Sequence, residues 1–209
     1  MTGGWIRKFL FMKDLKHETA KLLAKASQNL AQVVTSSSFE FWQRPDFRLY
    51  VNFSNISQTE QDRMFNELEV SVLGLFILHL DSALKTVQDE QKIVLSALQK
   101  DLASGFLQLL SSTGIEKKFI DQWKILIDMR LKEYREDFKT ATKASEKMRE
   151  FREEEALRNV WARIETITID SLSHIRRGEV KEGDPLWKLL RKWYITLDAK
   201  LNPLTQAKP

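Results

Sequence analysis

Histidine is the side chain that most often acts as an acid, a base or a metal ligand near neutral pH, and this chain has three of them. His17, His79 and His174 stand in neither the His-x-x-x-His nor the Glu-x-x-His spacing that metal sites in helical bundles use. Cysteine is absent, which excludes disulfides, catalytic thiols and thiolate metal sites. The sequence therefore predicts no cofactor and no metal site of a recognised type.

His79 stands out because it lies in the most apolar stretch of the chain. Asp81 follows two residues later and points to a different side of a helix, so it is not the natural partner of His79. A neutral, buried histidine that hydrogen-bonds to a nearby oxygen is the simpler interpretation, with a ligating or catalytic role as the alternative.

A narrow polar strip shares this stretch and includes Glu67, Ser71 and Asp81. If carboxylates of another helix, such as Asp121 and Asp128, faced it, the strip would line a polar cavity suited to a hard divalent cation. A solvated helix edge explains the same residues. We take Glu67, Ser71, His79 and Asp81 as the candidate pocket residues.

Basic residues near the two ends of the chain give a second candidate site, which would bind an anion if the fold brought them together. They are Lys8, Lys13, Arg176, Arg177, Arg191 and Lys192. Phosphate-binding glycine loops, dinucleotide-binding fingerprints and the nucleophile elbow of hydrolases are all absent. The sequence thus carries no catalytic signature.

The element that must position these residues is a helix expected over about 58–85. Ser57 and Glu60 fit a capping box at its start. The residues that follow are apolar on nearly all sides, so other helices must cover them. A membrane span needs about 20 apolar residues. Here Glu67 and Glu69 close the run on one side and Asp81 closes it on the other.

The sequence before this helix is less regular in its pattern of apolar residues. An amphipathic, mildly basic helix is expected over about 5–34, followed by a break at 35–38. Residues 39–53 alternate aromatic and polar positions around Arg44-Pro45-Asp46, which fits a small hairpin, an aromatic loop or a short helix from Pro45.

The segments after it are rich in helical periodicity. Residues 58–110 form either one bent helix or two. Ile115 to Arg177 contains no proline or glycine, and as one helix these 63 residues would reach about 95 Å. We therefore expect a reversal within 141–155, with 130–158 as a candidate projecting arm. Asp184 and Pro185 predict the start of a last helix that runs to about residue 200.

These elements together predict an all-α fold. We expect a single domain over 1–209, a bundle of about six helices around the 58–85 helix, with at most a small hairpin or irregular segment at 39–53. Lys plus Arg exceed Asp plus Glu by four, and the pI of about 9.2 does not by itself imply nucleic acid. No signal peptide or transmembrane segment is recognised, and we expect a cytoplasmic protein.

The functional hypothesis rests on two observations: the predicted helices carry apolar stripes, and the sequence has no catalytic motif. We expect a non-enzymatic protein that binds a protein partner or self-associates along the 3.5-type seam of 120–150. One alternative is nucleic-acid or anionic-membrane binding through the basic first helix. The other is a metal- or small-molecule-dependent enzyme around Glu67, His79 and Asp81.

Overall fold

Helix α3 (Gln58–Ala83) lies at the centre of the computed structural model, and every residue from Glu67 to Leu80 is buried. The structure describes residues 3–148, 154–178 and 180–205, with side chains described for 21–89, 91–148, 154–178 and 180–201. The predicted apolar helix over 58–85 is therefore confirmed, and it is enclosed as its composition requires.

Six further α-helices and one 3₁₀ turn complete the described part of the chain, which contains no strand, so the all-α prediction is confirmed. They are α1 (Gly3–Trp42), α2 (Pro45–Tyr50), the 3₁₀ turn η1 (Phe53–Asn55), α4 (Asp89–Ser112), α5 (Lys117–Ser145), α6 (Glu155–Arg176) and α7 (Pro185–Thr205).

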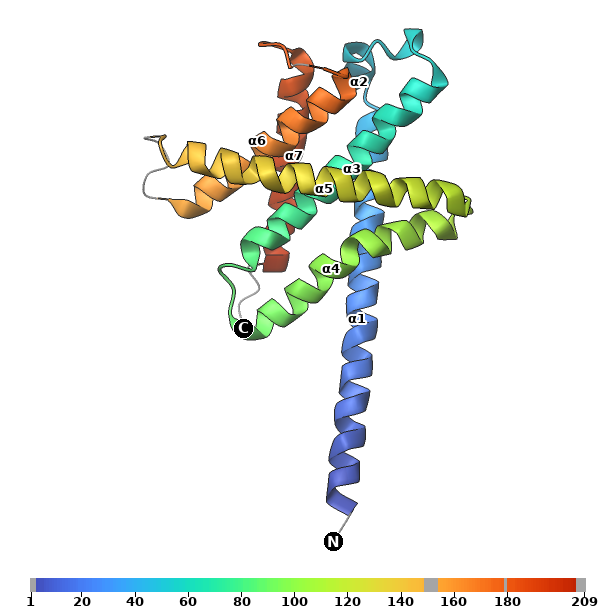
Figure 1. Ribbon diagram of the computed structural model, residues 1–209, viewed down its shortest axis with the longest axis vertical. Helices are drawn as coiled ribbons and strands as arrows, with labels where there is room; N and C mark the ends of the chain where they lie inside the picture. Colours follow the sequence, from blue (N-terminus) through green and yellow to red (C-terminus); the bar gives the residue numbers. More distant parts are fainter. Residues whose placement is uncertain (1–2, 149–153, 179, 206–209) are drawn as a thin grey trace.

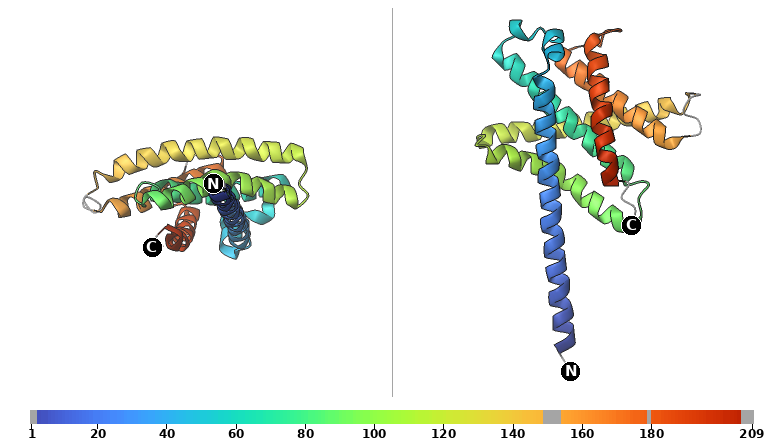
Figure 2. Two further views of the ribbon diagram at one scale, coloured as in Figure 1. Left: turned by 90° about the horizontal axis from the view of Figure 1, so that it is seen from below. Right: turned by 180° about the vertical axis from the view of Figure 1, so that it is seen from behind.

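The helices form three layers around α3 (Figures 1 and 2). Helices α3, α4 and α6 make up the middle layer, α5 covers one face, and α1 and α7 cover the other (Figure 2). Helix α1 runs along α4 and crosses α3, while α7 packs on α6 and α3. The first half of α1 continues beyond the bundle (Figure 1).

The predicted cap at the start of α3 is present. The Glu60 backbone N–H donates to Ser57 Oγ over 3.3 Å. The Glu60 carboxylate does not reach back to Ser57; it pairs with Arg63 and, at 2.7 Å, with Arg177. One half of the capping box therefore serves the helix end, and the other half ties α3 to the end of α6.

The predicted break at 35–38 is wrong, because α1 continues to Trp42. Ser37 and Ser38 are buried, and Ser36 donates a hydrogen bond to the Val33 carbonyl oxygen of its own helix. Small side chains let α1 lie close to its neighbours, and this tertiary packing overrides their weak helical propensity.

The aromatic segment at 39–53 is helical, so the hairpin is wrong and the short helix from Pro45 is right. Its rings join three helices. Phe41 stacks on Trp193 of α7 with centroids 4.0 Å apart, and Trp42 meets Phe65 of α3 edge-on at 5.6 Å. The alternation of aromatic residues reflects these contacts rather than strand pairing.

The remaining boundaries answer the questions that the sequence left open. Residues 58–110 hold two helices, since α3 ends at Ala83 and α4 begins at Asp89. The expected reversal lies between Ser145 and Glu155, and residues 149–153 of it are outside the described part. Pro185 begins α7, with Asp184 accepting from the Leu186 N–H at 2.9 Å. No described helix is long and apolar enough to cross a bilayer.

Candidate functional site

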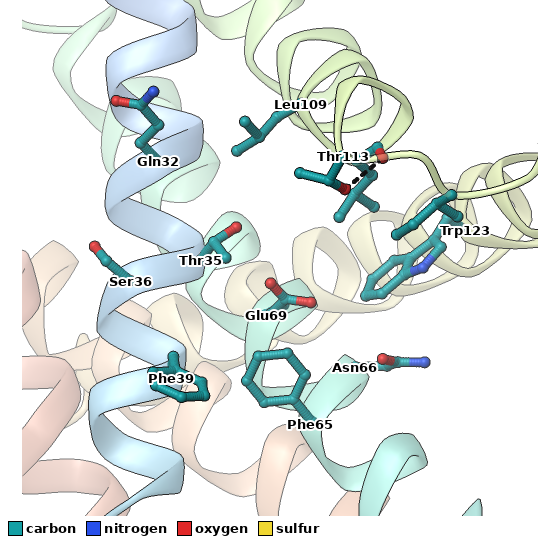
Figure 3. Close-up of a pocket in the computed structure, with 12 residues that line it drawn as sticks. Gln32, Thr35, Ser36, Phe39, Phe65, Asn66, Glu69, Leu109, Thr113 and Trp123 are labelled. Carbon is teal, nitrogen blue, oxygen red and sulfur yellow. Dashed lines mark hydrogen bonds between the residues drawn. The ribbon is translucent and has the colours of Figure 1, made fainter.

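An apolar cleft of about 590 Å³ opens between α1, α3, the end of α4 and the start of α5. Figure 3 shows it with α1 on one side and Trp123 on the other. We call it the Glu69 cleft, and its lining residues are Gln32, Thr35, Ser36, Phe39, Phe65, Asn66, Glu69, Leu109, Leu110, Thr113, Ile115 and Trp123. Its volume falls within the range of ligand-binding cavities, about 300–1,000 Å³.

Two glycines help to set the walls of the cleft. Gly105 of α4 lies against Ser27 of α1, whose hydroxyl donates to the Asp101 carbonyl oxygen at 2.9 Å, so the two helices meet closely. Gly114 has φ of +91°, a backbone conformation that favours glycine. It lies in the turn from α4 to α5, which brings Trp123 to the cleft.

Glu69 is the one ionisable side chain in the lining, and it is only 2% exposed. Burial raises the pKa of its carboxyl group to about 7, and the adjacent Thr35 hydroxyl offsets part of the rise. The Thr35 hydroxyl lies beside Glu69 (Figure 3) and has no hydrogen bond of regular geometry. The cleft thus has one buried carboxyl group, with the Thr35 hydroxyl beside it, at the base of apolar walls.

The apolar surface extends past the cleft. Phe39 at its rim is 53% exposed. A neighbouring cavity of about 280 Å³ is lined by Asn66, Phe119, Gln122, Trp123 and Leu126, so the two share Asn66 and Trp123. The two cavities therefore lie next to each other at the start of α5.

The groups around the Glu69 cleft suit binding better than catalysis. A general acid–base pair or an activated nucleophile needs a second titratable group within hydrogen-bond reach, and the lining contains none besides Glu69. A buried carboxyl group can instead accept hydrogen bonds from a ligand, and a bound cation would favour its ionised form.

The four predicted pocket residues lie along α3 but turn to different neighbours. Arg130 of α5 donates two hydrogen bonds to Glu67, over 3.0 and 2.8 Å. Ser71 and Tyr194 of α7 share a hydrogen bond of 2.7 Å. The Tyr134 ring packs directly on Gly74, so this side of α3 is filled by protein rather than by a polar pocket.

His79 and Asp81 point to opposite sides of the bundle, as their spacing implies. His79 Nδ1 lies 2.9 Å from Asp198 of α7, which also accepts two hydrogen bonds from Arg163 of α6. Asp81 pairs with Arg135 of α5 at 3.1 Å and with Gln99. Among the described residues, no group of three or more His, Asp or Glu side chains is arranged to hold a metal ion.

The candidate anion-binding residues are spread over the molecule. Lys8 and Lys13 lie in the first half of α1, where side chains are outside the described residues, and this half lies at the opposite end of the molecule from the end of α6 (Figure 1). Arg176 forms two hydrogen bonds with Asp184, over 2.9 and 3.0 Å, and Arg177 pairs with Glu60.

The other two candidates are on α7. Arg191 lies 3.6 Å from Glu165, and Lys192 is exposed. The three arginines thus each face a carboxylate within the chain, and the structure does not bring the six residues into one patch.

Sequence reasoning missed Glu69, which it treated only as the end of the apolar run. The available signal was its place between Leu68 and Val70 on a helix expected to be buried on nearly all sides. An acid at such a position is buried unless it falls on the polar strip. Compared with protein families, curated proteins and solved structures, the chain has no match.

Proposed function

We propose that this is a non-enzymatic binding protein whose Glu69 cleft receives the apolar side chains of an amphipathic helix from a protein partner. The observation that carries the proposal is a solvent-open apolar cleft with a single buried carboxyl group at its base and a second cavity beside it along α5. Helix-in-groove binding uses this combination of apolar walls and few polar anchors.

The charge of the cleft indicates the chemistry of the partner. Because Glu69 is the only ionisable group in the lining, a basic side chain of the partner would gain a charge-assisted hydrogen bond there. The apolar residues of a partner helix would pack against the walls of the cleft. One lysine or arginine between them would pair with Glu69 at its base. The absence of cysteine agrees with a reducing, cytoplasmic setting.

Self-association is one form of this proposal, but the apolar seam predicted over 120–150 is not free to contact a second copy. Ile127, Leu131, Tyr134 and Phe138 of that seam are buried inside the bundle. A second copy would have to use other α5 residues, of which Ile125 is 68% exposed.

The test is site-specific photo-crosslinking in the cells that make the protein. p-Benzoylphenylalanine replaces Thr113 at the rim of the cleft, and in a control it replaces the exposed Ile195 of α7. We expect a discrete crosslinked protein from position 113 that position 195 does not give. A crosslink to a second copy of the chain would assign self-association to the cleft.

The captured segment is then tested as a peptide. We expect Glu69→Gln to weaken its binding about tenfold through loss of the charged acceptor, and Glu136→Gln on the exposed face of α5 to leave it unchanged. The same crosslinks from both positions, or equal peptide affinity for the wild type and Glu69→Gln, would rule out the proposed role of the cleft.

The basic first helix supports a second candidate function. Its first half projects from the bundle (Figure 1) and carries Arg7, Lys8, Lys13 and Lys16 against one acid, Asp14, before residue 18. We propose an anionic membrane surface as its ligand, with nucleic acid as the competing polyanion. Co-sedimentation with phosphatidylserine vesicles at low salt, against neutral vesicles and duplex DNA, distinguishes the two, and binding to none of them ends this candidate.

We do not carry forward an enzyme centred on Glu67, His79 and Asp81. Glu67 and Asp81 pair with Arg130 and Arg135 of α5, and His79 lies against Asp198 of α7. These contacts hold α3 to α5 and α7, which is a structural task.

A further inference from the structure

A basic pocket of about 270 Å³ lies between the end of α3, the turn that follows it and the second half of α5. We call it the Lys139 pocket. Its lining contains four basic side chains, Lys85, Arg135, Lys139 and Lys143, against the single acid Asp81. It shares no lining residue with the Glu69 cleft, and the six anion-binding candidates predicted from the sequence include none of its residues.

Asp81 holds the Arg135 guanidinium at the edge of this pocket. Arg135 Nε donates to Asp81 Oδ2 over 3.1 Å, and Gln99 of α4 donates to the other oxygen of the same carboxylate. The Nη groups of Arg135 make no hydrogen bond to any residue that the structure describes, and its side chain is 44% exposed. The guanidinium is therefore positioned from one side and open to a ligand on the other.

The three lysines of the pocket are also open to a ligand. Lys85, Lys139 and Lys143 are all exposed, and none forms an ion pair with an acid whose side chain is described. Lys139 and Lys143 follow Arg135 at steps of four residues, so the three cations lie along one face of α5. Like charges at this spacing repel one another, and a bound anion would relieve the repulsion.

The acidic residues of the same part of α5 do not neutralise the pocket. Glu133 lies on the other flank of the helix, where it is 3.1 Å from His174 of α6. Asp137 lines a separate cavity between α5 and α6. Glu136 is exposed and forms no ion pair with a described residue. The charges of α5 are thus segregated, with the basic side chains gathered at the pocket.

The size and chemistry of the pocket indicate the class of anion. Its volume is just below the range of cavities that hold drug-sized ligands, about 300–1,000 Å³, so it suits a small molecule. A guanidinium beside several ammonium groups matches a phosphate group, which offers three acceptor oxygens and about two negative charges at neutral pH. Phe138, which is 7% exposed, and the carbon chains of the lysines supply apolar surface for the rest of the ligand.

We propose that the Lys139 pocket binds the phosphate group of a phosphate monoester. The Arg135 guanidinium and the ammonium groups of Lys85, Lys139 and Lys143 donate to the phosphate oxygens, and the esterified group lies toward Phe138. This site is independent of the function proposed for the Glu69 cleft, and the two can fail separately.

The probe is phenyl phosphate, compared with phenyl sulfate by isothermal titration calorimetry at pH 7.5 and low salt. The two molecules have nearly the same shape, but the phosphate carries about two negative charges at this pH and the sulfate carries one. We expect the phosphate to bind about tenfold more tightly. Equal binding of the two, or no saturable binding at millimolar phenyl phosphate, would overturn the proposal.

A matched pair of double variants locates the site. Lys139→Gln with Lys143→Gln removes two exposed charges from the pocket and should weaken phenyl phosphate binding at least about tenfold. Lys117→Gln with Lys124→Gln removes the same charge from exposed positions at the start of α5 and should leave the affinity unchanged. Wild-type affinity in the first variant, or an equal loss in both, would show that the phosphate does not bind in the pocket.

The same phosphate group can be carried by a soluble molecule or by a lipid. Co-sedimentation with vesicles that contain phosphatidic acid, a lipid with a monoester phosphate, separates the two sources. Binding that is lost in the Lys139→Gln, Lys143→Gln variant and kept in the Lys117→Gln, Lys124→Gln control supports the site in either assay. The assay in which it occurs identifies the source, and its absence from both contradicts the proposal.

Discussion

Arg163 of α6 and Asp198 of α7 form a bidentate ion pair, with hydrogen bonds of 2.7 and 2.8 Å, and both side chains are almost completely buried. His79 of α3 adds a third contact to the same carboxylate. Burial acts to raise the pKa of Asp198, but the hydrogen bonds from His79 and Arg163 outweigh it and hold this pKa below its usual value. The three residues connect the centre of the bundle to two of the helices that cover it.

Asp198→Ala should be one of the most destabilising single substitutions in the chain. It leaves the Arg163 guanidinium buried without its carboxylate, so the free energy of unfolding should fall by about 3–5 kcal/mol. Urea denaturation followed by circular dichroism measures the change. Asp128→Ala, at an exposed site on α5, should stay within about 0.5 kcal/mol of wild type. A loss below about 1 kcal/mol for Asp198→Ala would show that the network contributes little.

Glu69 should make the protein less stable as the pH rises from about 5 to 8. Up to about pH 7 the folded protein, in which the pKa of Glu69 is about 7, still holds the Glu69 proton, whereas the unfolded chain has already lost most of it. The shift corresponds to a loss on the order of 3 kcal/mol that is complete above the folded pKa.

The check is a denaturation series over pH in wild type and Glu69→Gln. Because other groups titrate equally in both proteins, the difference in stability between them isolates Glu69 and should grow in favour of the variant between pH 5 and pH 8. Glu136→Gln, at an exposed site, serves as the control. A difference that does not vary with pH would place the pKa of Glu69 near its ordinary value.

Gly74→Ala should destabilise the bundle although alanine is the better helix former. A methyl group at this position would overlap the buried Tyr134 ring and approach Ile167 to 3.3 Å. We expect a net cost of about 1–3 kcal/mol from overpacking. Gly178→Ala, where nothing lies within 4 Å, should be close to neutral in the same thermal and chemical denaturation measurements. Equal stability of the two variants would mean that Tyr134 moves aside at little cost.

Ser57→Ala should shorten or weaken the start of α3. The Ser57 hydroxyl accepts the Glu60 N–H, and loss of such a cap costs about 1 kcal/mol. Ser54→Ala, three residues earlier on the exposed side of the 3₁₀ turn, lacks this role and should be neutral. Hydrogen exchange of the Glu60 amide, faster in Ser57→Ala alone, would connect the loss to the helix end.

Local chemistry was enough to predict the centre of the fold. A run that is apolar on nearly all sides and too short to span a membrane needs other helices to cover it. Ser57 marks where this helix begins, and Pro185 marks where the last helix begins. These features depend on residues within one or two turns of each other. The all-α class and the central position of α3 could therefore be predicted from the sequence.

Contacts between distant helices decided the rest. No periodicity indicates that His79 meets an aspartate 119 residues later, or that Glu67 meets Arg130. The serines at 36–38 favour a break when taken alone, yet packing keeps α1 helical through them. Glu69 became a candidate binding group only in the tertiary structure, because the pKa of a carboxyl group depends on how much water and which charges surround it in the folded chain.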